Sequence, residues 1–414
     1  MILRRKFASA VVAVSLAVTT GVFCSISSSA ASTAGSAGAP AAAASSSAPI
    51  KFGLLCSCSG AGGFGAFILP AKKVLQAWAD TVNKSGGIDG HKVQLIVEDD
   101  GGNPATAVTN AKSLISDHVV AVATSSVADT AFASALTAAK IPVVGIEPNN
   151  GPFGTNPDFF PEGQTNDSSV YSVLTTAKRA GAKNLANVYC AESPDCAQSV
   201  PVFQSTGKKL GIPVTYDAEI AATAPNYTAQ CVAAKQQGVQ SVFIGDASVV
   251  IVHFATDCAV QGYTPTYVTE GAGFGVPMVT AKGLKDHLWT AFPTMPYFAT
   301  TSAVKKADAI INKHDPGLNK TPTYGQLPFM AWISGVLLET AIKAGGLTAK
   351  SAPSAAEVLK GLYALKGNTL GGLTVPLTFT KGKPHSITCW FTTRIQNGVP
   401  KLVSTKDTCD KTAP

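Results

Sequence analysis

The chain is 414 residues long, which is enough for two domains of ordinary size. Its net charge of +7 includes three basic residues close to the N-terminus, and no run of basic residues follows them. This distribution argues against binding of nucleic acid.

The N-terminus is predicted to be an export signal rather than part of the fold. Basic residues at positions 4–6 precede an apolar stretch at 8–22 that is too short to span a bilayer comfortably, and Ala, Ser and Gly dominate from there to about residue 48. We therefore assign residues 1–31 to a signal peptide and 32–49 to a low-complexity linker. The protein is expected to be secreted or associated with the cell surface, in a periplasmic or other extracytoplasmic location.

Two variants of this signal have to be weighed. The sequence Arg4-Arg5-Lys6-Phe7 has a twin-arginine character, although an Arg pair is common in ordinary signals. A lipid anchor at Cys24 is disfavoured, because the residue before a lipidated cysteine is normally small and here it is Phe23. No later apolar run is expected to be long enough to cross a membrane.

From residue 50 onwards, strands and helices are predicted to alternate. Short apolar, β-branched runs predict strands that are buried on both faces, and apolar residues at helical spacing predict the helices between them. In the first half, the expected strands are 50–55, 91–100, 119–123 and 141–146. The expected helices are 66–83, 104–116 and one that is capped by Asp129 or Thr130 and runs through 139. The acidic turn before residue 104 is expected to cap the second of these helices. This alternation predicts an α/β fold with a parallel, doubly wound sheet.

A second series with the same rhythm follows a loop at 147–165 that is rich in Pro, Gly and Asn. Its expected strands are 184–190, 212–220, 241–246 and 264–270, and its expected helices are 170–180, 197–210, 226–237 and 249–261. After Pro293 we expect helices at 302–313, 329–344 and 355–362 and strands at 374–379 and 387–394. The two series predict two similar α/β lobes.

Eight cysteines remain once Cys24 is set aside, and an even number in an exported chain favours disulfides. Cysteines that are near neighbours in sequence are expected to pair, as Cys190–Cys196, Cys231–Cys258 and Cys389–Cys409. Cys56 and Cys58 are left over, and a direct bond between them would be tight. The alternative for these two is a redox pair.

A glycine motif at 60–65 fits the pattern G-x-G-x-x-G of dinucleotide-binding folds. Residues 56–59 separate it from the preceding strand, and the acids at 98–100 lie too far along the chain to match the ribose contact of that fingerprint. A secreted oxidoreductase that uses a nucleotide or a thiol is therefore the competing hypothesis. The six histidines show no metal-ligand spacing, and neither a nucleophile elbow nor a Walker loop is present, so we expect no metal, no cofactor and no enzymatic activity.

Polar residues follow several predicted strands, at the edge of a parallel sheet where ligands bind. They are Ser57, Ser59, Ser125, Ser126, Asn149 and Asn150 in the first lobe and Asp246 and Glu270 in the second. Hydroxyls and free helix N–H groups bind a carboxylate, and an acid binds an ammonium group, so together these residues predict a site for a zwitterion. The competing interpretation is that the hydroxyls only cap the following helix.

Several of these stretches resemble a known family. They are IKFGLL with its Ser/Gly loop, VNKSGGIDGHKVQLIVEDDGGNP, VAVATSSVADTAFASAL with IPVVGIEP, and SVFIGD followed by YVTEG. From residue 50 to about 394 the chain resembles the type I periplasmic solute-binding proteins of ABC importers, in particular the leucine/isoleucine/valine-binding group.

The resemblance implies two doubly wound lobes, joined by three crossovers, that close like a Venus flytrap on a small ligand. Lobe one would comprise residues 50–168 plus 297–372, and lobe two would comprise 169–296 plus 373–414. The positions that match the ligand contacts of the family are Ser126 for the ligand carboxylate, Asn149 and Asn150 near a second polar contact, Phe64 as the covering aromatic and Glu270 for the ammonium group. Asp246 departs from the family, which often has an aromatic there, and this departure puts branched-chain specificity in doubt.

The function implied is capture of an amino acid, an amide or a related small acid and its delivery to an ABC permease and ATPase complex, by a monomeric protein without enzymatic activity. A ligand-sensing module that signals to a partner protein is a further alternative.

Overall fold

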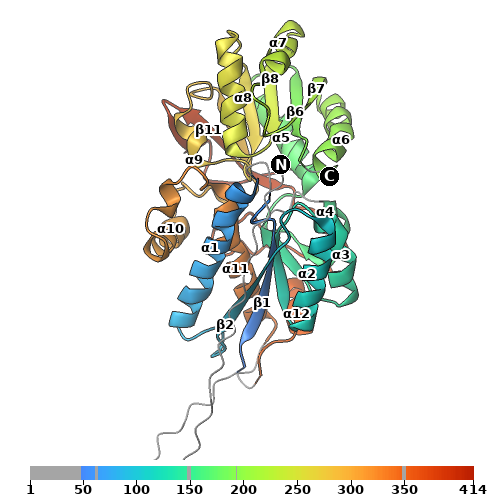
Figure 1. Cartoon of the computed structure of the whole chain (residues 1–414), viewed down its shortest axis with the longest axis vertical. Coiled ribbons are helices and arrows are strands. Elements are labelled where there is room, and N and C mark those ends of the chain that lie inside the picture. Colours follow the sequence, from blue (N-terminus) through green and yellow to red (C-terminus); the bar gives the residue numbers. More distant parts are fainter. Residues whose placement is uncertain (1–47, 61–63, 147–150, 193, 347–350) are drawn as a thin grey trace, which may run out of the picture. The chain divides into compact units, whose positions relative to one another are not determined.

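The computed structural model describes residues 48–60, 64–146, 151–192, 194–346 and 351–414. The predicted signal peptide, the linker up to residue 47 and Cys24 lie outside these residues. Within them the chain builds two sheets, and helices cover both faces of each sheet (Figure 1). We call the first sheet with its helices lobe one and the second lobe two.

The sheet of lobe one has five parallel strands in the order β2-β1-β3-β4-β5. Its strands are β1 (Ile50–Cys56), β2 (Val93–Asp99), β3 (Ala121–Ser125), β4 (Val143–Ile146) and β5 (Phe159–Phe160). Its helices are α1 (Phe64–Lys84), α2 (Pro104–Ser116), α3 (Asp129–Ala138), α4 (Gly151–Thr155), α10 (Ser302–His314), α11 (Gln326–Ala344) and α12 (Ala355–Ala364), with a short 3₁₀ helix at Leu318–Lys320. The parallel doubly wound prediction is confirmed.

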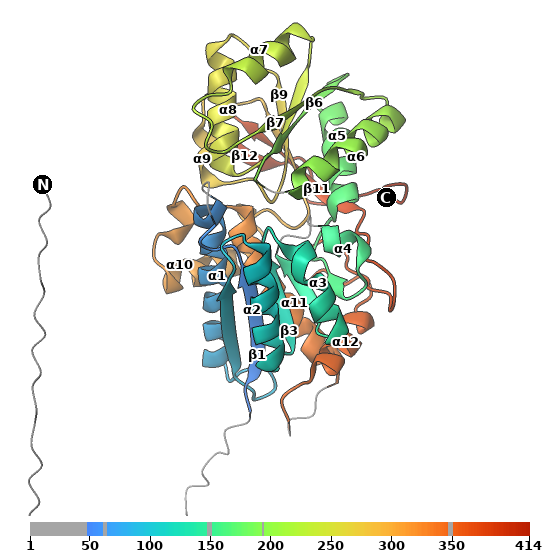
Figure 2. The same cartoon turned by 45° about the vertical axis from the view of Figure 1, so that its right-hand side comes forward.

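Side chains of β1 point alternately to the two faces of the sheet and belong to two separate cores in lobe one, as expected for a strand covered on both faces. Phe52 and Leu54 pack with residues of α1 and α11, whereas Leu55 packs with residues of α2 and α3. Figure 2 shows α2 and α3 together on one face of this sheet.

The sheet of lobe two has eight strands in the order β12-β11-β10-β9-β8-β6-β7, with β13 paired to β11. The parallel part comprises β6 (Leu185–Cys190), β7 (Val214–Ile220), β8 (Ser241–Gly245), β9 (Thr266–Glu270) and β10 (Leu288–Phe292), and the antiparallel part comprises β11 (Cys389–Gln396), β12 (Val399–Leu402) and β13 (Thr408–Cys409). Its helices are α5 (Asn166–Arg179), α6 (Pro194–Leu210), α7 (Thr228–Gln236), α8 (Ser248–Val260) and α9 (Val276–Thr280).

The chain passes between the two sheets three times, after β5, after β10 and after α12. The second and third passages run beside each other, because Thr294 pairs with Thr374 and the Met295 N–H donates to the Leu373 carbonyl at 2.9 Å. Here a prediction fails. Residues 374–379 form isolated bridges and no regular strand, since Pro376 lacks the N–H that a ladder requires.

Helix α11 is long and apolar enough to cross a membrane by length and composition, so the expectation that no such run follows the signal is wrong. Most of the helix is nevertheless buried inside the protein. It packs closely on α1, where a Cβ atom at Gly335 would lie only 2.3 Å from Cδ2 of Trp78. Its apolar character is therefore explained by a place in the core of lobe one.

The helix caps agree only in part with expectation. Asn103 caps α2, and its side-chain oxygen accepts from the N–H groups of Ala105 and Thr106, as predicted for that turn. The predicted cap of α3 by Asp129 or Thr130 is wrong, because the capping position belongs to Ala128. Asp129 instead accepts a hydrogen bond from the Thr124 hydroxyl at 2.6 Å.

The eight cysteines among the described residues form four disulfides. The structure joins Cys190 to Cys196, Cys231 to Cys258, Cys389 to Cys409 and Cys56 to Cys58. Three of these bonds are in lobe two, and only the last, at the carboxyl end of β1, is in lobe one.

Candidate functional site

In lobe one the carboxyl ends of the strands are organised around Asp100, the residue after β2. Its Oδ1 accepts from the Ser57 hydroxyl and from the Gly102 N–H, both at 2.7 Å, and its Oδ2 accepts from the Ser126 hydroxyl at 2.6 Å. Only 3% of Asp100 is exposed. These bonds satisfy both carboxylate oxygens of a buried acid inside the protein.

The two serines of this network also bind backbone N–H groups just before α3. The Ser57 oxygen accepts from the Val127 N–H at 3.1 Å, and the Ser126 oxygen accepts from the Ala128 N–H at 3.0 Å. Ser126 thus binds the backbone just before the helix and donates its hydroxyl proton to Asp100, but it does not cap α3, whose capping residue is Ala128, without a side-chain cap bond. Its predicted contact with a ligand carboxylate stays a prediction.

Ser125 is different from its neighbour. It is the last residue of β3 and fully buried, and its hydroxyl has no hydrogen-bond partner among the described residues. A hydroxyl enclosed without a partner loses its bonds to water and gains none in return. The Ser125 hydroxyl is thus not used by the part of the protein that the structure describes.

In lobe two, Asp246 occupies the corresponding place directly after β8. It is 9% exposed, its Oδ1 accepts from the Ala247 N–H at 2.6 Å, and its Oδ2 has no partner among the described residues. Burial raises the pKa of this carboxyl to about 7; the bond from Ala247 opposes the rise and the charge of Glu192 adds to it. Asp246 is therefore a buried acid of which one oxygen is unpaired among the described residues.

Glu192 was not singled out from the sequence, yet it lies at the same edge. It follows β6 by two residues, in the loop that the Cys190–Cys196 disulfide closes. Its Oε1 accepts from the Ala222 N–H at 2.6 Å, and its Oε2 is buried without a partner. The signal was available in the sequence, because Glu192 is an acid just beyond a predicted strand, as Asp246 and Glu270 are.

Glu270, predicted to hold an ammonium group, is the last residue of β9, the neighbour of β8 in the sheet. It is partly buried, and its Oε2 accepts from the Ser169 hydroxyl of α5 at 3.0 Å. Ser169 is a second residue that the sequence did not indicate. The structure thus brings Asp246 and Glu270 to adjacent strand ends of one sheet.

Three predicted residues are not tested by this geometry. Asn149 and Asn150 lie outside the described residues, and Phe64 is described only as the first residue of α1, without its side chain.

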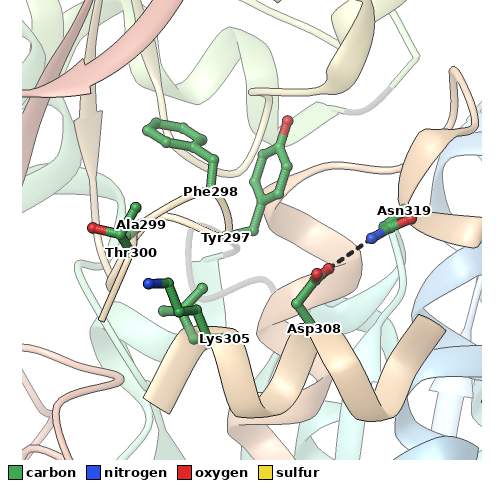
Figure 3. A pocket seen from close by; sticks show the side chains of 8 residues that line it. Tyr297, Phe298, Ala299, Thr300, Lys305, Asp308 and Asn319 are labelled. Carbon is green, nitrogen blue, oxygen red and sulfur yellow. Dashed lines mark hydrogen bonds between the residues drawn. The ribbon is translucent and has the colours of Figure 1, made fainter. Parts of the chain in front are cut away.

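A pocket of about 270 Å³ lies elsewhere, beside α10 and the segment after β10 (Figure 3). Tyr297 and Phe298 form one side of it, and Asp308 accepts from the Asn319 amide at 2.9 Å on another. None of the predicted site residues lines this pocket.

Two features bear on the competing enzyme hypotheses. Both oxygens of Asp100 accept from Ser57, Gly102 and Ser126, so this acid is not placed to hold a ribose. Every cysteine among the described residues is in a disulfide, which leaves no thiolate there. Cys389, Cys409 and Asp407 lie close together, but the two sulfur atoms are bonded to each other rather than available to a metal.

Comparisons with solved structures agree with the fold. The chain is similar to a fatty acid ABC transporter substrate-binding protein from Thermomonospora curvata, at 16% identity and a TM-score of 0.74 over 88% of this chain and 93% of that one. It is also similar to the leucine-binding protein LivK from Thermotoga maritima, at 16% identity and a TM-score of 0.69 over 86% and 98% of the two chains. The isoleucine complex of the branched-chain amino acid binding protein LivJ from Streptococcus pneumoniae matches at 18% identity and a TM-score of 0.69, over 87% and 100%.

No curated protein matches the chain significantly. A family model described as periplasmic binding protein matches residues 49–400, which is most of the chain. That model covers both sheets, the helices on their faces and the three passages between them. The chain therefore belongs to the periplasmic binding protein family, and its two α/β lobes have the type I fold of that family.

Proposed function

We propose that this protein is an extracytoplasmic solute-binding protein that encloses a small amino-acid-like ligand between its two lobes and delivers it to an ABC permease. The family match supports a solute-binding role, and the names of the similar structures include binders of leucine, isoleucine and fatty acids. All of these ligands carry a carboxylate. We infer the class of ligand from the polar atoms of this chain.

One observation carries the proposal. At the carboxyl ends of the strands, lobe one offers a buried hydroxyl, at Ser125, and lobe two offers a buried carboxylate oxygen, at Asp246, and neither has a hydrogen-bond partner among the residues that the structure describes. A donor on one side and an acceptor on the other fit the two ends of a zwitterion, with the carboxylate at Ser125 and the ammonium group at the acids of lobe two. Among these acids, Glu270 is the one that the family resemblance assigns to the α-ammonium group.

The mechanism is a ligand-linked shift of population and involves no chemical step. An open form binds the ligand on one lobe, and closure completes its bonds with the other, so the ligand stabilises the closed form by its additional contacts there. Asp100 has the role of a support, because its bonds to Ser57 and Ser126 hold the strand ends of lobe one in place before the ligand arrives.

The export and the partner follow from the same proposal. Residues 1–31 would be removed as a signal peptide, the linker would leave the lobes free outside the cytoplasm, and the protein would present its closed form to the permease as a monomer.

Thermal unfolding of the mature protein against a panel of amino acids, amides, urea, aromatic acids and NAD tests the function. A true ligand at a hundredfold excess over its Kd raises the free energy of unfolding by about 3 kcal/mol. We expect such a shift with at least one amino acid. A shift with NAD alone would contradict the proposal and would favour an enzyme that uses the glycine loop at 60–65.

A further inference from the structure

We propose that Asp246 and Glu192 form a second acidic subsite in lobe two, which selects ligands with an additional positively charged nitrogen, such as lysine, ornithine or arginine. The inference rests on the proposed function and goes further, since it names the class of amino acid. It also assigns a binding role to Glu192, which lies outside the residues indicated by the sequence.

The topology brings the two acids to one place. Strands β6 and β8 are neighbours in the sheet and run parallel, with Tyr189 opposite Gly245 in the register. Asp246 follows Gly245 directly and Glu192 follows Tyr189 by three residues, so both leave the sheet at the same edge. The two acids also act on the same tyrosine. Burial raises the pKa of Tyr227 most, and the charges of Asp246 and Glu192 raise it further.

A backbone N–H group binds one carboxylate oxygen of each acid, and the second oxygen of each acid is not bound within the described residues. The Ala247 N–H holds Oδ1 of Asp246, and the Ala222 N–H holds Oε1 of Glu192. Each remaining oxygen, Oδ2 and Oε2, is buried and has no hydrogen-bond partner in the part of the chain that the structure describes. The loop of Glu192 is additionally closed by the Cys190–Cys196 disulfide. The two free oxygens therefore belong to side chains that are already held in place.

Leaving two buried carboxylate oxygens unpaired is costly, and a structural role does not explain it. No Lys, Arg or His among the described residues forms an ion pair with Asp246 or Glu192. A neutral apolar ligand side chain would make the cost larger, because it would exclude water and supply no donor. An ammonium or guanidinium group supplies several donors together with the compensating charge.

The number of acids matches a ligand with two positive groups. We assign the α-ammonium group that every amino acid carries to Glu270, which lies on β9, on the far side of β8 from β6. Asp246 and Glu192, on β8 and β6, would then receive the nitrogen at the end of a longer side chain.

The test compares ligands that differ only in this nitrogen. Calorimetric titration of the mature full-length protein at neutral to mildly alkaline pH uses lysine, ornithine, arginine, norleucine and Nε-acetyl-lysine. Norleucine is lysine without its side-chain amine, and Nε-acetyl-lysine keeps the nitrogen without the charge. We expect at least one basic amino acid to bind about tenfold or more tightly than norleucine, which corresponds to about 1.4 kcal/mol.

Two isosteric variants, Asp246→Asn and Glu192→Gln, should each reduce this preference about tenfold. Asp217→Asn is the matched control, because Asp217 is a carboxylate of the same lobe whose oxygens are paired with Asn187 and Gln204, and the preference should survive its change. If one of the two acid variants does not fold, the other still tests whether the preference for a basic amino acid depends on this subsite.

The outcomes separate the two proposals. Binding of norleucine or leucine with no preference for a basic amino acid would overturn the acidic subsite while it supports the amino-acid function. A preference that persists in both acid variants would overturn the subsite as well. Absence of binding by every amino acid of the panel would overturn the proposed function itself, and the subsite with it.

Discussion

The two lobes share a fold but bind the acids Asp100 and Asp246 at their strand ends differently. In lobe one the buried acid Asp100 receives three hydrogen bonds, from two serine hydroxyls and one backbone N–H. In lobe two the buried acid Asp246 receives one, and its Oδ2 has no partner among the described residues. Burial of Asp100 is thus compensated within its own lobe, whereas burial of Asp246 is compensated only in part.

The two lobes also differ in the number of their disulfides. Lobe two contains three disulfides, one of them directly beside Glu192, whereas lobe one contains only the bond between Cys56 and Cys58. Cross-links supply stability to lobe two without donating a hydrogen bond to its acids. We infer that lobe one is held by its polar network and lobe two by its disulfides.

Removal of the Cys231–Cys258 bond, which joins α7 to α8, should have the largest effect. The bond spans 27 residues, and a double Cys→Ala variant should lower the free energy of unfolding by about 3–4 kcal/mol, because the unfolded chain is released from a long loop. Urea unfolding measures the change. The pair Cys190→Ala and Cys196→Ala, with a separation of 6, is the control and should cost about 2 kcal/mol. A loss for Cys231–Cys258 no greater than that of the control would contradict the inference.

Asp100→Ala should destabilise lobe one by about 3 kcal/mol, since it leaves the hydroxyls of Ser57 and Ser126 and the Gly102 N–H without an acceptor. The same urea titration applies. Ser57→Ala, which removes only part of the network, should cost about half as much. If Asp100→Ala costs no more than Ser57→Ala, the acid is not the centre of the network.

The pH dependence of stability should reveal Asp246 in lobe two. Burial raises its folded pKa to about 7, well above the ordinary value for Asp, so the folded state binds the proton more tightly than the unfolded state. Stability is therefore favoured at low pH and is lost as the pH rises toward that folded pKa. The free energy of unfolding should fall by at least about 1 kcal/mol more in the unsubstituted protein than in Asp246→Asn between about pH 5 and pH 8.

Other groups near Asp246 titrate as well, and the comparison with the variant removes their contribution. Glu192 and Tyr227 interact with Asp246 directly, while Asp257 and its neighbour His253 lie on the adjoining helix α8. If the two proteins have identical pH profiles, burial does not raise the pKa of the Asp246 carboxyl in the folded state.

The fold was largely predictable because buried parallel strands appear in the sequence as short apolar runs. Strand β10 was missed, since five residues between a charged turn and Pro293 carry little local signal and gain their strand character by pairing with β9 and β11. The proposed strand at 374–379 failed for the opposite reason, because a local apolar pattern was accepted across Pro376.

The sequence indicated which polar residues lie at the strand ends but not how they are hydrogen-bonded. Acids and hydroxyls after strands were found from the sequence, yet the serine that is paired could not be told from the serine that is not. The partner of Ser126 is 26 residues away and that of Ser57 is 43 residues away. Such contacts depend on the order of strands β2, β1 and β3 in the sheet, which no short motif encodes.

Ser125 and Ser126 are adjacent in lobe one but differ in their hydrogen bonds. Substituting each in turn separates a role in ligand binding from a role in stability. Ser125→Ala should weaken the binding of lysine or norleucine, whichever binds, by about tenfold, because it removes the unpaired hydroxyl that we propose for the ligand carboxylate. Its stability should stay within about 0.5 kcal/mol of the original, since no bond within the protein is lost.

Ser126→Ala should show the reverse. Its hydroxyl bonds to Asp100 and to the Ala128 N–H, so the free energy of unfolding should fall by about 1–2 kcal/mol while the affinity changes by less than about threefold. Calorimetric titration and urea unfolding of both variants measure the two quantities. If instead Ser126→Ala abolishes binding and Ser125→Ala does not, the ligand contact belongs to Ser126 as the family resemblance implies, and the free hydroxyl of Ser125 has no part in recognition.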